Sequence, residues 1–114
     1  MTEPRRVHSL AEARAVLAAA GDADEAVVLE SPPAAAGHQG IGWWRALLAG
    51  LAAEFPDRGI EAVLDCGSAP GHALEALRAG VKAVRLDAPA ETLAALDQIA
   101  AALGGVVLRP SSFR

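Results

Sequence analysis

The stretch Ala62-Val-Leu-Asp-Cys-Gly-Ser-Ala-Pro-Gly71 decides the fold of this chain. Its apolar first residues predict a buried strand that ends at Asp65, and Gly67 lies in the turn that follows. Pro70 fits the first turn of a new helix, where the amide hydrogen that proline lacks would have no partner anyway. In parallel α/β proteins, ligands and catalytic groups gather at such junctions, outside the carboxyl ends of the strands. The stretch therefore predicts a parallel α/β fold with a polar rim.

The same alternation of strand and helix repeats along the whole chain. Apolar residues recur every three or four positions in the predicted helices, which is the spacing of one buried helix face. The predicted helices cover residues 10–20, 40–55, 70–79 and 89–103, and the predicted strands cover residues 25–30, 60–65, 81–87 and 106–109. Short, nearly all-apolar strands that alternate with helices predict four parallel strands and four helices, joined by right-handed crossovers.

We expect a single α/β domain over residues 9–109, between a flexible N-terminal tail of residues 1–8 and a C-terminal tail of residues 110–114. Residues 31–39 are predicted to form a loop, because two prolines and Gly37 interrupt any regular structure there.

Two arrangements of the strands remain open. If the strands lie in sequential order, all crossovers place helices on one face, as in a half-barrel, and a second copy of the chain must cover the bare face. If the order reverses once, as in a small doubly wound sheet, helices cover both faces and a monomer suffices. Trp43, beside the core residue Trp44, adds an apolar flank that either covers the other side of the sheet or meets another subunit. We expect a homodimer.

Composition excludes several classes of protein. The chain of 114 residues is 53% hydrophobic, and its net charge of −4 comes without the basic stripe of nucleic-acid binders. Its single cysteine excludes an internal disulfide and multi-cysteine metal motifs. No signal peptide or transmembrane stretch is visible. We therefore expect a soluble cytoplasmic protein with no cofactor or metal, and with neither nucleic acid nor membrane as a partner.

Charged side chains follow the predicted strands. Glu30, Asp65 and Asp87 end the first three strands, and Arg109 ends the last. Because the carboxyl ends of parallel strands share one edge of the sheet, these residues predict a common ligand-binding rim. Asp65 is the candidate catalytic residue. Its carboxylate could act as a general base or hold a hydroxyl group of a ligand. Alternatively, it accepts hydrogen bonds from the amides of its own turn, at Gly67 and Ser68. Arg85 interrupts an apolar strand and is expected to pair with a carboxylate.

Cys66 and His38 are further candidates for ligand binding. Cys66 lies near the start of the third predicted helix, whose dipole would lower the pKa of the thiol and favour the thiolate. A small buried hydrophobic residue explains it equally well. His38 lies in the glycine-rich stretch of residues 37–42, where free amides at a helix start could bind an anion. Alternatively, the glycines serve only to form a flexible turn, and His38 is simply a surface residue.

Several stretches resemble the class II fructose-bisphosphate aldolases, which are (β/α)8 barrels. They are Val63-Leu-Asp-Cys-Gly67, Ala76-Leu-Arg-Ala-Gly80, Val84-Arg-Leu-Asp87 and, upstream, Val28-Leu-Glu-Ser31. Together they span most of the chain but only half of a barrel. The resemblance implies that Asp65 takes the position of the proton-transfer aspartate. Cys66 stands where the family has a zinc-binding histidine, and the strands that carry the other ligands are absent.

The stretch Val63–Gly71 is also similar to the first motif of the class I methyltransferases, especially the branch that methylates RNA ribose. Asp87 follows Gly67 by 20 positions, where an acidic residue would bind a ribose. This resemblance implies binding of S-adenosylmethionine and covers 25 residues, 63–87.

Two classes of function follow from these observations. The first is a module without catalysis of its own, which binds a small polar or phosphorylated molecule, or a protein partner, at the rim. The second is an enzyme or enzyme remnant, aldolase-like or methyltransferase-like. The predicted site is the same rim in both cases.

Overall fold

Five parallel strands form one open sheet in the part of the computed structural model that is described, residues 3–21 and 26–110. The strands are β1 (Arg5–Arg6), β2 (Val27–Glu30), β3 (Ile60–Asp65), β4 (Ala83–Arg85) and β5 (Val106–Leu108). The helices are α1 (Leu10–Ala20), α2 (Ala35–His38), α3 (Ile41–Glu54), α4 (Pro70–Arg78) and α5 (Ala90–Leu103). The predicted α/β fold with parallel strands is confirmed. Glu25, the expected start of the first strand, and residues 1–2 and 111–114 of the expected tails lie outside the described residues.

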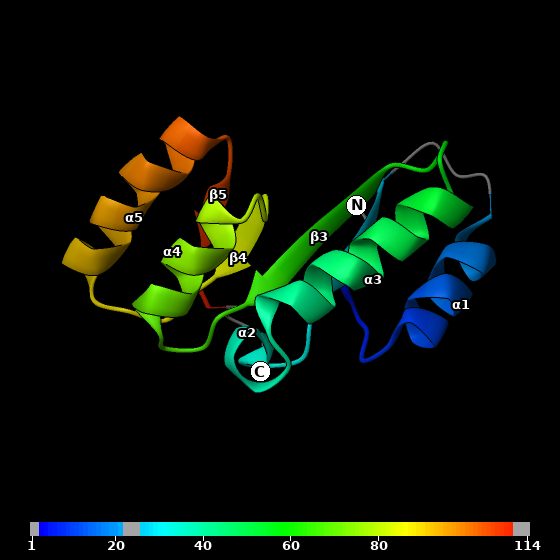
Figure 1. The fold of residues 1–114 in the computed structure, drawn as a ribbon, viewed down its shortest axis with the longest axis horizontal. Coiled ribbons are helices and arrows are strands. Elements are labelled where there is room, and N and C mark those ends of the chain that lie inside the picture. Colours follow the sequence, from blue (N-terminus) through cyan, green and yellow to red (C-terminus); the bar gives the residue numbers. More distant parts are fainter. Residues whose placement is uncertain (1–2, 22–25, 111–114) are drawn as a thin grey trace.

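The order of the strands decides between the two expected arrangements. The strands lie side by side in sequential order, β1-β2-β3-β4-β5. This order excludes the doubly wound sheet, in which the order reverses once. Right-handed crossovers between strands in this order place the helices on one face, and Figure 1 shows α1, α3, α4 and α5 on the same side of the sheet.

The sheet has one strand more than the predicted four. Arg5 and Arg6 pair in parallel with Leu29 and Glu30, so these two residues form an edge strand rather than part of a flexible tail. Val7 follows them, is fully buried, and donates its amide to the Glu30 carbonyl at 2.9 Å. A strand of two residues is too short to show the alternation by which strands are recognised in a sequence.

A short helix, α2, interrupts the predicted loop of residues 31–39. Ala34 precedes it in a left-handed conformation, with φ of 55°. The Ala34 amide donates to Asp65 Oδ1, 2.9 Å away at the end of β3. The prediction of an irregular loop is therefore wrong for Ala35–His38, because a contact from a distant part of the chain fixes the turn that starts this helix.

The core lies between the helices and the covered face of the sheet. Trp44 and Leu51 of α3 are fully buried in one apolar cluster with Leu29 of β2 and Leu64 of β3. Pro70 is the first residue of α4, as predicted. No helix within the described residues is both long and apolar enough to span a membrane.

The flank beside Trp44 packs within the chain. Trp43 is partly buried against the core, and its ring centroid lies 5.8 Å from that of Trp44. Leu47, on the same flank, is buried. A methyl group at Gly50 would lie 3.4 Å from Leu10 Cδ2 of α1. The flank therefore meets α1, on the side of the sheet that the other helices cover.

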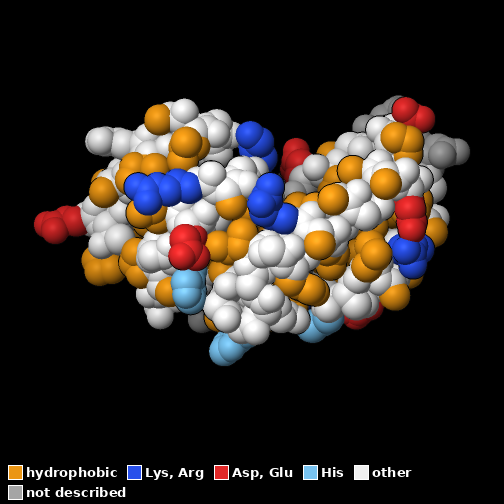
Figure 2. All heavy atoms as spheres, viewed as in Figure 1, with side chains coloured by type: hydrophobic (Ala, Val, Ile, Leu, Met, Phe, Trp, Pro, Cys, Tyr) orange, Lys and Arg blue, Asp and Glu red, His pale blue; other side chains and the backbone are white. Residues whose placement is uncertain are grey.

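The two halves of the sheet are joined at the carboxyl end of β3. β3 pairs with β2 from Ile60 to Val63, but with β4 only at Leu64 and Asp65. Towards their amino ends β3 and β4 diverge. Figure 2 shows a hollow between the part that carries α3 and the part that carries α4 and α5. The carboxyl ends of the strands, where the polar residues lie, are thus held closer together than the amino ends.

Candidate functional site

A pocket of about 530 Å³ opens at the carboxyl ends of the strands. It includes three of the four predicted rim residues, and Arg109 is the exception. The polar side chains that line it are those of Arg6, Glu30, Asp65, Ser68, Arg85 and Asp87. These residues come from β1, β2, β3, β4 and the segments that follow β3 and β4.

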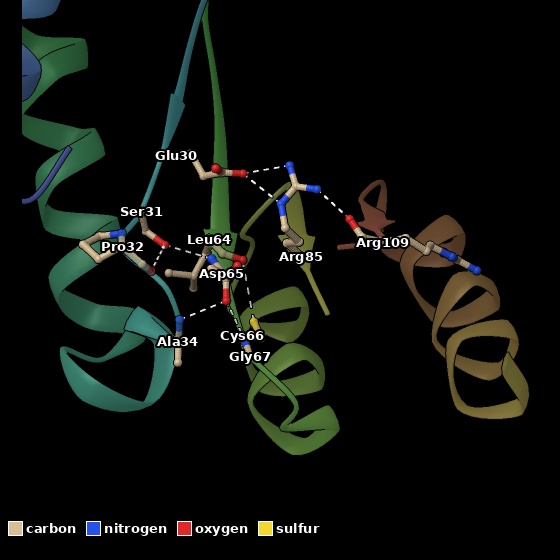
Figure 3. A network of polar contacts seen from close by, with 10 residues as sticks. All are labelled: Glu30, Ser31, Pro32, Ala34, Leu64, Asp65, Cys66, Gly67, Arg85 and Arg109. Atoms are coloured by element: carbon tan, nitrogen blue, oxygen red, sulfur yellow. Dashed lines mark hydrogen bonds and ion pairs between the residues drawn. The ribbon is translucent and has the colours of Figure 1, made fainter. Parts of the chain in front are cut away.

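Glu30 and Arg85 form an ion pair at the pocket (Figure 3). Arg85 donates from Nε to Glu30 Oε1 at 2.8 Å, and its Nη2 lies 2.7 Å from the same oxygen. The Glu30 side chain is only 15% exposed and the Arg85 side chain only 18%. The expected pairing of Arg85 with a carboxylate is confirmed. Glu30 Oε2 makes no hydrogen bond with the described residues, so one oxygen of this carboxylate is left for other partners.

Asp65 is held in place through one carboxylate oxygen. Its Oδ1 accepts hydrogen bonds from the amides of Gly67, at 2.8 Å, and Ala34, at 2.9 Å. The expected bond to the turn after β3 is thus confirmed at Gly67, and the second donor comes from the loop after β2 instead of from Ser68. Among the described residues, Asp65 Oδ2 has no hydrogen-bond partner. The carboxylate is therefore oriented by one oxygen and can accept from a ligand with the other.

Ser31 ties the ends of β2 and β3 together beneath the pocket. It is 1% exposed, and its Oγ accepts the Asp65 amide at 2.8 Å and donates to the Pro32 carbonyl at 3.1 Å. Figure 3 shows this serine between the two strand ends, next to the carboxylate that it positions. Ser31 fixes the backbone from which Asp65 projects.

Asp87, Arg6 and Ser68 supply the unpaired polar groups of the pocket. The Asp87 amide donates to the Gly67 carbonyl at 2.8 Å, which fixes the backbone beside Asp65. The side chains of Asp87, Arg6 and Ser68 are exposed and make no hydrogen bond or ion pair with the described residues. They remain available to a bound molecule.

Arg109 turns away from the pocket. Its guanidinium pairs with Asp97 of α5, with both nitrogen–oxygen distances at 2.8 Å. This pairing lowers the pKa of Asp97 and raises that of Arg109. Only the backbone of Arg109 reaches the site, where its carbonyl accepts from Arg85 Nη1 at 2.6 Å. The prediction of Arg109 as a rim side chain does not agree with this geometry, because a nearer carboxylate on α5 takes its guanidinium.

Cys66 lies beneath the site and is 1% exposed. Burial, followed by the negative charge of Asp65, raises the pKa of its thiol to about 12. The expectation of a thiolate favoured by the helix dipole is therefore wrong, and the alternative of a small buried residue agrees with the structure. The sulfur makes only a weak contact, 3.8 Å from the Leu64 carbonyl oxygen.

His38 is exposed at the end of α2 and does not line the pocket. The amides of residues 37–40 all donate to carbonyls of Ala34 and Ala35, at 2.8 to 3.1 Å. These four amides are therefore not free to bind an anion, and residues 37–40 form a turn, as in the alternative interpretation.

No local signal in the sequence indicates that Arg6 belongs to the pocket, because a strand of two residues leaves no pattern. Ser68 offered a signal, since it directly follows Gly67 in the turn after β3. The position of Arg85 in an apolar strand predicts a carboxylate partner, but it does not predict that Arg85 lines the pocket.

Comparison of the chain with protein-family models and with curated proteins gave no match. Within the described residues, no group of three or more His, Cys, Asp and Glu side chains is placed to hold a metal ion. What the pocket offers is a set of carboxylate oxygens, one hydroxyl group and two guanidinium groups.

Proposed function

We propose that this domain binds a small polar molecule in the pocket at the carboxyl ends of its strands, through hydroxyl or amino groups of the ligand. The observation that carries this proposal is the convergence of Glu30, Asp65 and Asp87 on one pocket, each with at least one carboxylate oxygen unused by the described residues. Such oxygens accept hydrogen bonds, so the matching ligand is one that donates them.

The charge of the lining favours a neutral or cationic ligand over a phosphorylated one. Glu30 and Arg85 neutralise each other in their ion pair. Asp65 and Asp87 then face a single remaining cation, Arg6. A phosphate group would meet an excess of negative charge, whereas a sugar hydroxyl or an ammonium group would be attracted.

The lining also supports binding without catalysis. The pocket has no histidine, lysine or cysteine among its described lining residues. Asp65, the one candidate for proton transfer, has an oxygen engaged by two backbone amides. These features suit a carboxylate that is fixed to hold a ligand.

An enzyme related to the aldolases is the second candidate, because Asp65 does reach the pocket from the end of β3. In that case Asp65 would take a proton from a substrate carbon, as the resemblance in sequence implies. Replacement of Asp65 by asparagine distinguishes the two. A binding module would lose affinity for a polyhydroxy ligand, because the amide nitrogen of asparagine cannot accept a hydrogen bond, while an enzyme would lose turnover and retain its substrate.

The proposal is tested by thermal unfolding with ribose, glucose, glucosamine, ribose 5-phosphate and S-adenosylmethionine as probes. A ligand at 100 times its dissociation constant adds about 2.7 kcal/mol to the free energy of unfolding, which is easily detected. We expect a rise in Tm with the sugars or the amino sugar, and loss of that rise in Asp87→Asn. Glu75→Gln, on the exposed surface of α4, is the matched control. A rise with ribose 5-phosphate or S-adenosylmethionine alone contradicts the proposal.

A further inference from the structure

The edge of β3 that faces β4 is open over most of its length. β2 covers the other edge from Ile60 to Val63. On the β4 side, register pairs occur only at Leu64 and Asp65. The described residues therefore provide no strand beside residues 60–63 on this side.

The backbone groups that face the open side can be identified from the register. In a parallel sheet, the N–H and C=O groups of one residue point to the same neighbouring strand, and those of the next residue point to the strand on the other side. The carbonyls of Gly59 and Val63 accept from β2, while the amide of Cys66 donates to Arg85 of β4. Ile60 and Ala62 consequently direct their N–H and C=O groups towards the β4 side, where no described strand pairs with them. An open strand edge of this kind is a template for another chain.

A groove of about 890 Å³ lies along this open edge. We call it the β3 groove, and the side chains that the argument uses are Arg45, Leu48, Phe55, Ile60, Ala62 and Lys82. Leu48 of α3 and Phe55, which directly follows this helix, form an apolar wall and are partly buried against the core. The opposite wall is the segment from Gly80 to Ala83. Apolar side chains of an inserted strand would find contacts here, in addition to the backbone groups.

Unpaired positive charge borders the groove. Arg45 of α3 and Lys82, just before β4, are exposed and make no ion pair with the described residues. Figure 2 shows Lys and Arg side chains at the borders of the hollow. Glu61 also lines the groove, is exposed and makes no ion pair with the described residues, so two cations there face one carboxylate. In a chain with a net charge of −4, this local excess of cations favours an acidic occupant.

We propose that the β3 groove binds an extended, acidic peptide segment of another protein, which adds a strand to the open edge of β3. Its backbone pairs with the N–H and C=O groups of Ile60 and Ala62. Its apolar side chains contact Leu48 and Phe55, and its carboxylates meet Arg45 and Lys82. This mode of recognition is strand addition, in which main-chain bonds supply affinity and side-chain contacts supply specificity.

A second copy of this chain is the less suitable occupant. Pairing two β3 edges would bring two sets of Arg45 and Lys82 together, and like charges oppose such an approach. The groove also closes where β3 and β4 pair at Leu64, so it suits one narrow extended segment better than a whole sheet edge.

The test uses a blocked heptapeptide of sequence Glu-Thr-Val-Thr-Val-Thr-Glu, in which the valines and the terminal glutamates share one face of an added strand. The same peptide with lysine in place of both glutamates is its charge control. Amide hydrogen exchange is followed by NMR. Without peptide, the amides of Ile60 and Ala62 should exchange fast, whereas those of Glu61 and Val63, which face β2, are protected. The acidic peptide should slow exchange at Ile60 and Ala62 alone. A version of the same peptide that is N-methylated on alternate residues should bind at least about fivefold more weakly, since it has lost strand hydrogen bonds.

Protein variants provide an independent readout. Ala62→Pro removes an N–H group that has no strand partner in the structure, and an edge position tolerates this change. It should keep the circular dichroism spectrum and weaken acidic peptide binding about fivefold. Lys82→Glu should weaken it about threefold, and Arg78→Glu, on the exposed face of α4, should not change it. If Ala62→Pro does not fold, the N-methylated peptide carries the same test.

Three results would overturn the proposal. The first is no binding of the acidic heptapeptide at millimolar concentration, or equal binding of the lysine peptide. The second is binding that leaves exchange at Ile60 and Ala62 unchanged. The third is protection of these two amides in the free protein together with a doubled mass in light scattering, which would assign the edge to a second copy.

Discussion

The carboxylate of Glu30 and the guanidinium of Arg85 meet 2.7 Å apart, although their strands, β2 and β4, are separated in the sheet by β3. The pair therefore bridges three strands at the end where β3 and β4 are held together. It stands beside the Asp65 carboxylate and defines one wall of the pocket (Figure 3). In this position the pair links the two halves of the sheet and neutralises two of the charges that line the pocket.

Arg85→Met is expected to lower the free energy of unfolding by about 1–3 kcal/mol, because it leaves the mostly buried Glu30 carboxylate without its partner. Urea denaturation measures this directly. Arg14→Met, which breaks the exposed pair of Arg14 with Glu54, is the matched control and should have little effect. The double variant Glu30→Met/Arg85→Met should be more stable than Arg85→Met alone. If the double variant is the less stable of the two, the unpaired charge is not the cause of the loss.

Ser31→Ala is expected to cost about 1–3 kcal/mol of stability, since the Asp65 amide would lose its acceptor at a buried position. Ser68→Ala, at the exposed neighbouring turn, should leave the melting temperature almost unchanged. Differential scanning calorimetry on the three proteins is the measurement. Equal melting temperatures for wild type and Ser31→Ala would show that the bond between the two strand ends carries no net stability.

Most of the fold could be predicted from local signals in the sequence. Pro70 marks the start of α4, and the apolar run before Asp65 marks β3, because proline and buried strands each leave a signature within a few residues. β1 and α2 leave none. β1 depends on two residues that pair with β2, and α2 depends on the hydrogen bond from Ala34 to Asp65 Oδ1. Their partners lie 24 and 31 positions away along the chain, respectively, so no local pattern can indicate them.

The sequence predicts the site residues whose positions follow from the backbone, but not those whose positions depend on the partner of a long side chain. The ends of parallel strands meet at one edge, so Glu30, Asp65 and Asp87 come together in the pocket. Arg109 has the same kind of position, but its long side chain reaches Asp97 of α5 instead. Arg6 joins the pocket only because β1 exists.

Cys66 is expected to be unreactive in the native protein. Burial raises the pKa of its thiol to about 12, so the thiolate is nearly absent at neutral pH. Labelling with iodoacetamide at about pH 8 should be slow in buffer and fast in urea, where the thiol regains an ordinary pKa. Mass spectrometry of the alkylated chain follows both rates. Fast labelling without urea would mean that the thiol is accessible in the folded state.

Gly37→Ala should destabilise the domain through a specific clash. A methyl group at this position would lie 2.8 Å from Cε1 of His72, so the imidazole would have to move. We expect a loss of about 1–2 kcal/mol, typical of overpacking. Because the clash is with a side chain, His72→Ala should remove most of the additional cost in a double-mutant cycle. Additive effects of the two substitutions would contradict the contact between α4 and α2 at residue 37.

The exposed ion pairs of Glu54 and Asp97 should make stability fall in acid. Hydrogen bonds from Arg14 and Arg109, respectively, lower the pKa values of these carboxyl groups below the ordinary 4.5 for glutamate and 3.8 for aspartate. The stabilisation from each pair is therefore complete above the ordinary pKa of its carboxyl group and is lost as the pH falls through the lower pKa of the folded state.

Urea denaturation from about pH 6 down to about pH 3 should show a decline in the free energy of unfolding. This decline should be shallower in Glu54→Gln than in wild type, because the variant has no carboxyl group to protonate there. Glu75→Gln removes a carboxylate for which no pair exists among the described residues, and it should keep the slope of the wild type. Identical slopes for Glu54→Gln and wild type would show that the pair with Arg14 does not persist in solution.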